Sequence, residues 1–186
     1  MTAEDDFASF IADLEVLVSH GTDEHQVAHE VARRLRRLLA GGFTLPPGFS
    51  RPGDGTYVMY PLHVDPDGRF SVAAAVWDVG QATPVHGHET WGVVGIYSGI
   101  EGETRYVKPA VEGVPLEIAE ADLRWRPGEV AVCCTTDDDV HRVECVGEVP
   151  CIGIHVYGAD IGTLPRRAYD PATGEVRWFT SSWGAA

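Results

Sequence analysis

The sequence has no long apolar run, and this absence excludes a helix that spans a bilayer. No stretch approaches the roughly 20 consecutive apolar residues that a membrane crossing requires. The first ten residues are acidic and contain no apolar core of the kind found in a secretory leader. We therefore expect a cytoplasmic protein.

Positive charge is also scarce. The 186 residues include 14 lysines and arginines against 28 aspartates and glutamates, which gives a formal net charge of -14. A surface of this sign repels phosphate backbones and anionic lipid headgroups. We expect neither nucleic acid nor a membrane as a partner.

Cysteine motifs are absent as well. The four cysteines form no Cys-x-x-Cys pair and no zinc-finger spacing, which predicts buried or free thiols rather than a disulfide framework. Cys133 and Cys134 are adjacent, and on a regular strand their side chains would face opposite sides of the sheet.

Apolar residues recur at three- and four-residue steps in the first forty residues, which predicts two helices. Gly21 separates the two runs, and Thr22 and Asp23 can cap the second helix. Two glycines at 41–42 end that helix. The apolar positions are Phe7, Phe10, Ile11, Leu14, Leu17 and Val18 in the first run, and Val27, Val31, Leu35, Leu38 and Leu39 in the second.

The pattern changes after these helices to short β-like runs separated by turn residues. The runs cover residues 57–64, 70–79, 91–100, 104–111, 129–134, 141–146, 151–157 and 175–180. Many short strands in one chain are typical of an antiparallel barrel or sandwich. We expect a mostly β protein in which residues 57–180 form a jelly-roll β-barrel and residues 1–42 form helices packed on its outside. The length suits a single domain over residues 1–186.

The most informative motif is the His-Gly-His sequence at residues 86–88. Side chains two apart on a strand share a face, so the two imidazoles can chelate a metal ion. Imidazole suits iron, copper, zinc and nickel, and the pair alone does not select among them. His141 is the candidate third ligand, whereas Glu89 and Glu144 have the opposite parity to their neighbouring histidines. Three neutral ligands leave the ion its full charge, which favours an anionic substrate such as a thiolate with a carboxylate.

Four short motifs follow one another along the predicted barrel: residues 80–88, which end in His-Gly-His; residues 91–99, which begin with Trp-Gly; residues 141–144; and residues 155–158. Together they resemble the thiol dioxygenases, the cysteine dioxygenase family of the cupin superfamily, over about residues 57–167. Cupins often carry a glutamate soon after the histidine pair. Gly92 and Val93 stand there in this chain, as in thiol dioxygenases.

The resemblance implies a cupin barrel with one Fe(II) ion held by His86, His88 and His141. It also implies that a small thiol and dioxygen are the substrates, and that both oxygen atoms end on sulfur to give a sulfinic acid.

The same resemblance implies catalytic roles for His155 and Tyr157. They match the last two members of a Ser-x-His-x-Tyr relay, in which the histidine orients the tyrosine hydroxyl. Gly153 replaces the serine.

Substrate recognition departs from the animal-type enzymes, which carry an arginine at the position of Tyr60 and a cysteine at the position of Val93. Tyr60 has no guanidinium, and no thioether to Tyr157 can form from Val93. Arg166 follows Tyr157 by nine residues, the spacing at which 3-mercaptopropionate dioxygenases carry a carboxylate-binding arginine. We expect Arg166 and Tyr60 to contact substrate, and 3-mercaptopropionate to be favoured over cysteine.

Two other functions stay open on the sequence. Three histidines with an open position also describe a zinc or nickel enzyme, such as a hydrolase or isomerase. A cupin that binds a small ligand without catalysis is the second alternative.

Overall fold

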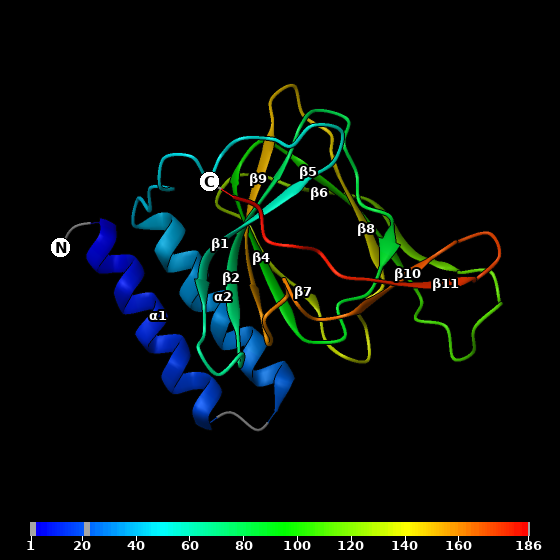
Figure 1. Cartoon of the computed structure of the whole chain (residues 1–186), viewed down its shortest axis with the longest axis horizontal. Helices are drawn as coiled ribbons and strands as arrows, with labels where there is room; N and C mark the ends of the chain where they lie inside the picture. The colour runs from blue at the N-terminus through cyan, green and yellow to red at the C-terminus, as the bar shows by residue number, and fades with distance from the viewer. Residues whose placement is uncertain (1–2, 21–22, 186) are drawn as a thin grey trace.

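The computed structural model describes residues 3–20 and 23–185, and within them two helices precede eleven strands (Figure 1). The helices are α1 (Ala3–His20) and α2 (Glu24–Ala40). The strands are β1 (Val58–Val64), β2 (Ser71–Trp77), β3 (Val85–His86), β4 (Gly92–Ser98), β5 (Glu101–Tyr106), β6 (Ile118–Trp125), β7 (Val130–Cys134), β8 (His141–Cys145), β9 (Cys151–Tyr157), β10 (Arg166–Tyr169) and β11 (Val176–Phe179).

The strands form two antiparallel sheets in the order β1-β2-β9-β4-β7 and β11-β10-β3-β8-β5-β6. The chain passes repeatedly from one sheet to the other, as between β4 and β5 or between β8 and β9, which is the connectivity of a jelly-roll, or double-stranded β-helix. The mostly β fold with an N-terminal helical segment is therefore confirmed. Strands β3, β6 and β10 were not among the predicted runs.

Both predicted helices are present. Asp23 caps α2, because its Oδ1 accepts a hydrogen bond from the backbone N–H of Gln26 at 3.0 Å. At the other end, the N–H of Gly41 donates to the carbonyl of Arg37 at 2.9 Å. Gly21 and Thr22 lie outside the described residues. Neither described helix combines the length and apolar character that a membrane crossing needs.

The helices cover the outer face of the five-stranded sheet, as Figure 1 shows for α2 beside β2 and β4. The core under α2 contains Leu35 and Ile154, both with no exposed surface. β9 is buried along its whole length, with Ile154 directed to the helices and Tyr157 to the barrel interior. One strand thus joins the helical core to the cavity described below. The assignment of residues 1–186 to one domain stays a prediction.

The prediction that Cys133 and Cys134 face opposite sides of a sheet is wrong. The pairing of β7 with β4 shifts by one residue, so that Gly92 lies opposite Cys134 while Val93 lies opposite Val132. Such a β-bulge places an extra residue on one strand and breaks the alternation of faces. The two Sγ atoms are 3.4 Å apart. All four cysteines are free and buried, as expected.

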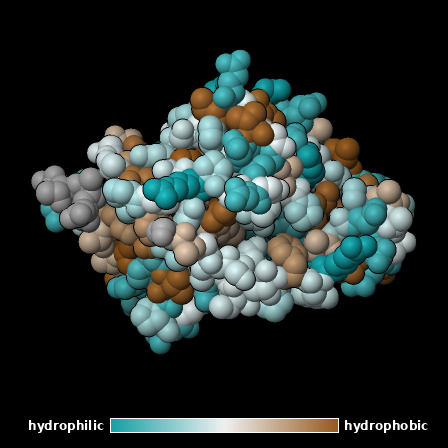
Figure 2. All heavy atoms as spheres, turned by 45° about the horizontal axis from the view of Figure 1, so that its top comes forward, coloured by the Kyte–Doolittle hydropathy of each residue, from teal (hydrophilic) through white to brown (hydrophobic). Residues whose placement is uncertain are grey.

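Exposed apolar side chains are scattered over the surface. Figure 2 shows one face, on which hydrophobic residues lie in small groups among hydrophilic ones. Trp178 on β11 is 61% exposed and Ile118 on β6 is 60% exposed. Both belong to the outermost strands of the six-stranded sheet.

Candidate metal centre

Three histidines meet inside the barrel. The ring centroids of His86, His88 and His141 are 4.8 to 4.9 Å apart in each pair, and one nitrogen from each ring lies within 4.8 Å of the others. His86 on β3 is directly opposite His141 on β8. His88 follows β3 by two residues. The three side chains are 1 to 4% exposed.

Hydrogen bonds place a proton on the Nδ1 atoms of two of these rings. His86 Nδ1 is 3.0 Å from the carbonyl oxygen of Pro84, and His141 Nδ1 is 2.8 Å from Oε1 of Glu103. Both oxygens only accept, so each Nδ1 carries a proton, and in the neutral form of each ring Nε2 then keeps a free lone pair. His141 Nε2 is buried without a hydrogen-bond partner among the described residues. A metal ion would satisfy it, and the three-histidine group can hold one.

The environment of His86 and His88 favours their neutral forms. Burial, followed by the charges of His141 and Arg166, lowers the pKa of His86 well below its usual value. Burial also lowers the pKa of His88, with His86 and His141 adding to the shift. Metal ligation requires deprotonated imidazole, so the site is prepared for an ion near neutral pH.

Glu103 on β5 forms a hydrogen bond with the ring of His141 and is not itself one of the grouped ligand atoms. Burial raises the pKa of Glu103, but the hydrogen bond and charge of His141 together with Arg105 outweigh it and lower the pKa to about 2. Trp125 Nε1 donates to Oε2 of Glu103 at 2.8 Å. Such carboxylate–histidine pairs fix the ring orientation and raise the basicity of the ligand.

A second buried carboxylate holds the backbone around His88. Oδ2 of Asp139 accepts hydrogen bonds from the N–H groups of His88 and Glu89, each at 3.1 Å, and Oδ1 lies 2.8 Å from Lys108 Nζ. This approach requires glycine at position 87, because an added Cβ there would lie 2.8 Å from Oδ2 of Asp139. The glycine between the two histidines is thus fixed by packing.

The two glutamates that are close to the histidine motifs in sequence lie outside the three-histidine group. This agrees with the prediction that their side chains leave the opposite face of the strand. Glu89 forms a two-point ion pair with Arg167, with both N–O distances at 2.7 Å. Glu144 pairs with Arg142 at 2.8 Å on the outer side of β8. Neither belongs to the three-histidine group.

The histidines line a cavity of about 20 Å³, which they share with His155, Tyr157 and Arg166. A cavity of this size holds about one water molecule or a single ion, so a larger ligand can enter only if the side chains around it move. Six strands contribute to it, because β3, β8, β9 and β10 supply polar groups, β1 supplies Met59, and β2 supplies Ala75 and Trp77.

Arg166 on β10 is 1% exposed, yet it forms no ion pair with any residue that the structure describes. Its Nη2 donates to Oγ of Ser181, and its guanidinium carbon lies 4.7 Å from the centre of the Phe179 ring. Its Nε is buried and has no hydrogen-bond partner in the described part of the chain. A buried charge is costly unless it is paired, so this cationic group favours an anionic ligand in the cavity.

His155 and Tyr157 lie side by side on β9, and His155 Nδ1 is 2.8 Å from the Tyr157 hydroxyl. Burial, followed by the charges of His141 and Arg166, lowers the pKa of His155 to about 3, so the ring is neutral. The His155 ring occupies the place of a side chain at Gly153, where an added Cβ would lie 2.5 Å from Nε2. The Tyr157 ring also stacks on His88, with centroids 5.1 Å apart.

Tyr60 is the predicted site residue that the structure does not bring to the cavity. It packs in the core beneath the helices, and its hydroxyl donates to the carbonyl of Arg51 at 2.9 Å. Side chains alternate along β1, so its neighbour Met59 lines the cavity instead.

Glu103 and Asp139 were missed by the sequence analysis. Glu103 lay just outside the predicted run at 104–111, whereas β5 begins at Glu101. The alternation of Glu101, Glu103 and Arg105 was a usable signal, because it places these side chains on one face. Asp139 precedes β8 in a run of three aspartates that resembles a solvated loop.

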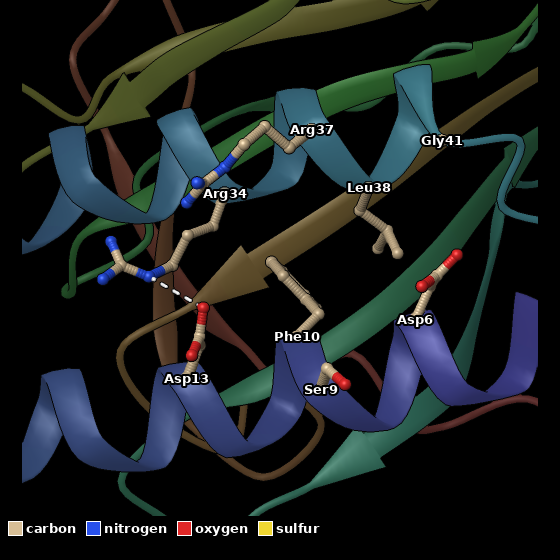
Figure 3. A pocket seen from close by; sticks show the side chains of 8 residues that line it. All are labelled: Asp6, Ser9, Phe10, Asp13, Arg34, Arg37, Leu38 and Gly41. Atoms are coloured by element: carbon tan, nitrogen blue, oxygen red, sulfur yellow. Dashed lines mark ion pairs between the residues drawn. The ribbon is translucent and has the colours of Figure 1, made fainter. Parts of the chain in front are cut away.

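A larger groove lies outside the barrel, between the two helices (Figure 3), and has a volume of about 270 Å³. Arg34 of α2 reaches Asp13 of α1 across it, with 3.5 Å between Nε and Oδ2. The three-histidine group is not part of its lining. The candidate metal ligands therefore lie in the smaller cavity and not in this groove.

No protein-family model matches the chain. Similar solved structures include a double-stranded β-helix protein from Klebsiella pneumoniae, at 14% identity over 77% of this chain and 94% of the other, with a TM-score of 0.47. An RmlC-like cupin from Ralstonia eutropha matches at 14% identity over 69% of each chain, with a TM-score of 0.47. An RmlC-like cupin from Methanocaldococcus jannaschii matches at 12% identity over 62% of this chain and 93% of the other, with a TM-score of 0.43.

Proposed function

We propose that the protein is an Fe(II)-dependent thiol dioxygenase of the cupin superfamily, with His86, His88 and His141 as the iron ligands. Its substrate is a small thiol carboxylic acid, 3-mercaptopropionate in preference to cysteine, and its product is the sulfinic acid. The observation that carries the proposal is the shared cavity, in which three imidazoles lie together with a buried arginine that has no acidic partner among the described residues.

Charge balance supports this substrate class. A divalent ion and Arg166 bring three positive charges to the cavity, whereas the charge of Glu103 is already paired with Arg105. A thiolate with a carboxylate offsets two of these three charges. Neutral thiols and amino thiols without a carboxylate leave the guanidinium unpaired, which is costly in a buried site.

The residues of this chain bind and orient the substrate. Iron(II), when bound, supplies the centre at which sulfur and dioxygen react. Arg166 can hold the carboxylate with two parallel hydrogen bonds, which fixes the distance from the acid group to the sulfur. Tyr157 offers its hydroxyl to the reacting atoms, and His155 holds that hydroxyl through Nδ1.

The test is oxygen uptake by protein loaded with Fe(II) under anaerobic conditions. We expect uptake with 3-mercaptopropionate, weaker uptake with cysteine and the least with cysteamine, which has no carboxylate. Mass spectrometry should find a sulfinic acid that gains both atoms of isotopically labelled dioxygen.

Tyr157→Phe removes only the hydroxyl and should lower kcat, because His155 then has no group to orient. Tyr60→Phe is the matched control, since Tyr60 lies away from the cavity and should leave kcat unchanged. Protein that retains zinc in preference to iron and consumes no oxygen with any of these thiols would contradict the proposal.

A further inference from the structure

A second group of possible ligand atoms adjoins the three-histidine centre. The Sγ atoms of Cys133 and Cys134 are 3.4 Å apart, and a ring nitrogen of His88 lies within 4.8 Å of both. All three side chains are buried, and both thiols are free. Nδ1 of His88 is buried with no hydrogen-bond partner among the described residues. Nothing in the proposed oxygenation uses the two thiols.

The bulge in β7 and the glycine opposite it create this arrangement. Cys133 is the extra residue of the bulge, so its side chain joins that of Cys134 on one face. Both sulfurs occupy the space beside Gly92, where an added Cβ would lie 2.5 Å from one Sγ and 2.9 Å from the other. A side chain at this position would push the thiols apart.

We propose that Cys133, Cys134 and His88 form a binding site for one soft metal ion, of the class of Zn(II), Cd(II) or Cu(I), and that an ion bound there competes with the three-histidine centre for His88. Thiolate ligands select such ions over harder ones. Two cysteines and one histidine are a recognised ligand set for zinc. Zn–S bonds of about 2.3 Å place two sulfurs on a tetrahedral ion about 3.8 Å apart, a few tenths of an ångström more than observed here.

Binding exchanges protons for the ion. Burial raises the pKa of the Cys134 thiol, so it stays protonated until an ion arrives. A divalent ion that takes both thiolates releases two protons, and the resulting group of two thiolates, one neutral imidazole and one ion has no net charge. A neutral group of this kind is compatible with a buried position. The competition with iron rests on the proposed function, whereas binding to the dithiol does not.

The test is titration of the reduced, iron-free protein with Cd(II). A thiolate-to-cadmium charge-transfer band in the ultraviolet reports on sulfur ligation and is silent for imidazole. We expect a band that saturates at one ion per chain, with release of two protons measured in buffers of different ionisation enthalpy. Cys133→Ser with Cys134→Ser should abolish the band. Cys145→Ser with Cys151→Ser, the other two buried thiols, is the matched control and should retain it.

Cadmium NMR of the unaltered protein should report two sulfur ligands, which keeps the test independent of whether the variants fold. Prior loading with Fe(II) should shift the cadmium titration to higher concentrations. No band, a band that survives the Cys133 and Cys134 replacements, or a signal with one sulfur or none would overturn the proposal.

These readouts need no turnover. Absence of the band with normal thiol oxidation refutes the dithiol site alone, and a band without thiol oxidation refutes the dioxygenase alone.

Discussion

At the scale of single residues, the centre is organised by the partners of its histidines more than by the histidines themselves. The carbonyl oxygen of Pro84 accepts a hydrogen bond from Nδ1 of His86, and Glu103 accepts one from Nδ1 of His141. In each ring this leaves Nε2 as the nitrogen that can face an ion. Within the described ranges the Nδ1 of His88 has no such acceptor, and His88 is held instead through its backbone N–H, which donates to Asp139. The three rings therefore differ in how firmly they are oriented. His88 is the ring that the three-histidine centre shares with the proposed site at Cys133 and Cys134.

Replacing Glu103 tests the carboxylate–histidine pair. Glu103→Gln keeps the size of the side chain but removes the charge that fixes the His141 tautomer, so we expect the affinity for a divalent ion to fall by about 10- to 100-fold. The measurement is calorimetric titration of the metal-free protein with Co(II) or Fe(II). Glu120→Gln, an exposed glutamate on β6, is the control and should change nothing. Unchanged affinity in Glu103→Gln would show that the hydrogen bond does not tune the site.

Replacing Arg166 tests the acid-binding role. Hydrogen bonds to a charged group contribute about 1.5–3 kcal/mol, so Arg166→Gln should raise KM for 3-mercaptopropionate by roughly 10- to 100-fold. The weak oxidation of cysteamine should change little, because that thiol has no carboxylate. Steady-state oxygen uptake measures both values. Arg177→Gln, on the neighbouring strand and exposed, should behave as the unaltered protein. Equal losses for both thiols would argue for a general structural role of Arg166.

At the scale of elements, the strands with clear alternation or long apolar runs were predictable and the others were not. β9 follows its predicted range, because a fully buried strand is apolar throughout. β6 is an edge strand with mostly exposed residues, so no period of two marks it. β3 has two residues, and its place depends on pairing with β8 and β10, which are far away in the sequence.

The same distinction applies to the site. The spacing of His86 and His88 is local and could be read from the sequence. The register that brings β8 beside β3 and the bulge in β7 are properties of paired strands, and a single sequence does not display them. Tyr60 was assigned to the site by counting back along the sequence from His86. An error of one residue in such a count moves a side chain to the other face of the strand.

The packing of α2 on β4 can be tested without touching the cavity. Leu35 has no exposed surface, and its Cδ2 occupies the space above Gly95. Leu35→Ala should lower the free energy of unfolding by about 2–5 kcal/mol while metal affinity stays unchanged. Urea denaturation measures the first and calorimetry the second. Val16→Ala, at a position 63% exposed, should cost less than about 0.5 kcal/mol. A large loss of metal affinity in Leu35→Ala would mean that the helices also support the centre.

At the scale of the whole molecule, buried titratable groups make stability depend on pH in two opposing ways. His155 is neutral in the folded state with a pKa of about 3, so stability falls as pH drops below 6.5, where the unfolded chain takes up the proton. Glu101 acts in the other direction. It is 3% exposed, and burial, followed by the charge of Glu103, raises its pKa from 4.5 to about 8. The folded protein keeps this proton where the unfolded chain loses it.

Stability should therefore decline as pH rises from 4.5 to about 8 through Glu101 alone, by an amount on the order of a few kcal/mol, and should level off above that range. Glu101→Gln removes the ionisation, so its stability relative to the unaltered protein should increase steadily across this interval. Urea unfolding of the metal-free proteins at several pH values measures the difference, and Glu120→Gln should give a difference that does not change with pH. A constant difference for Glu101→Gln as well would mean that Glu101 ionises in the folded barrel at its ordinary pKa. The decline would then have to come from other groups.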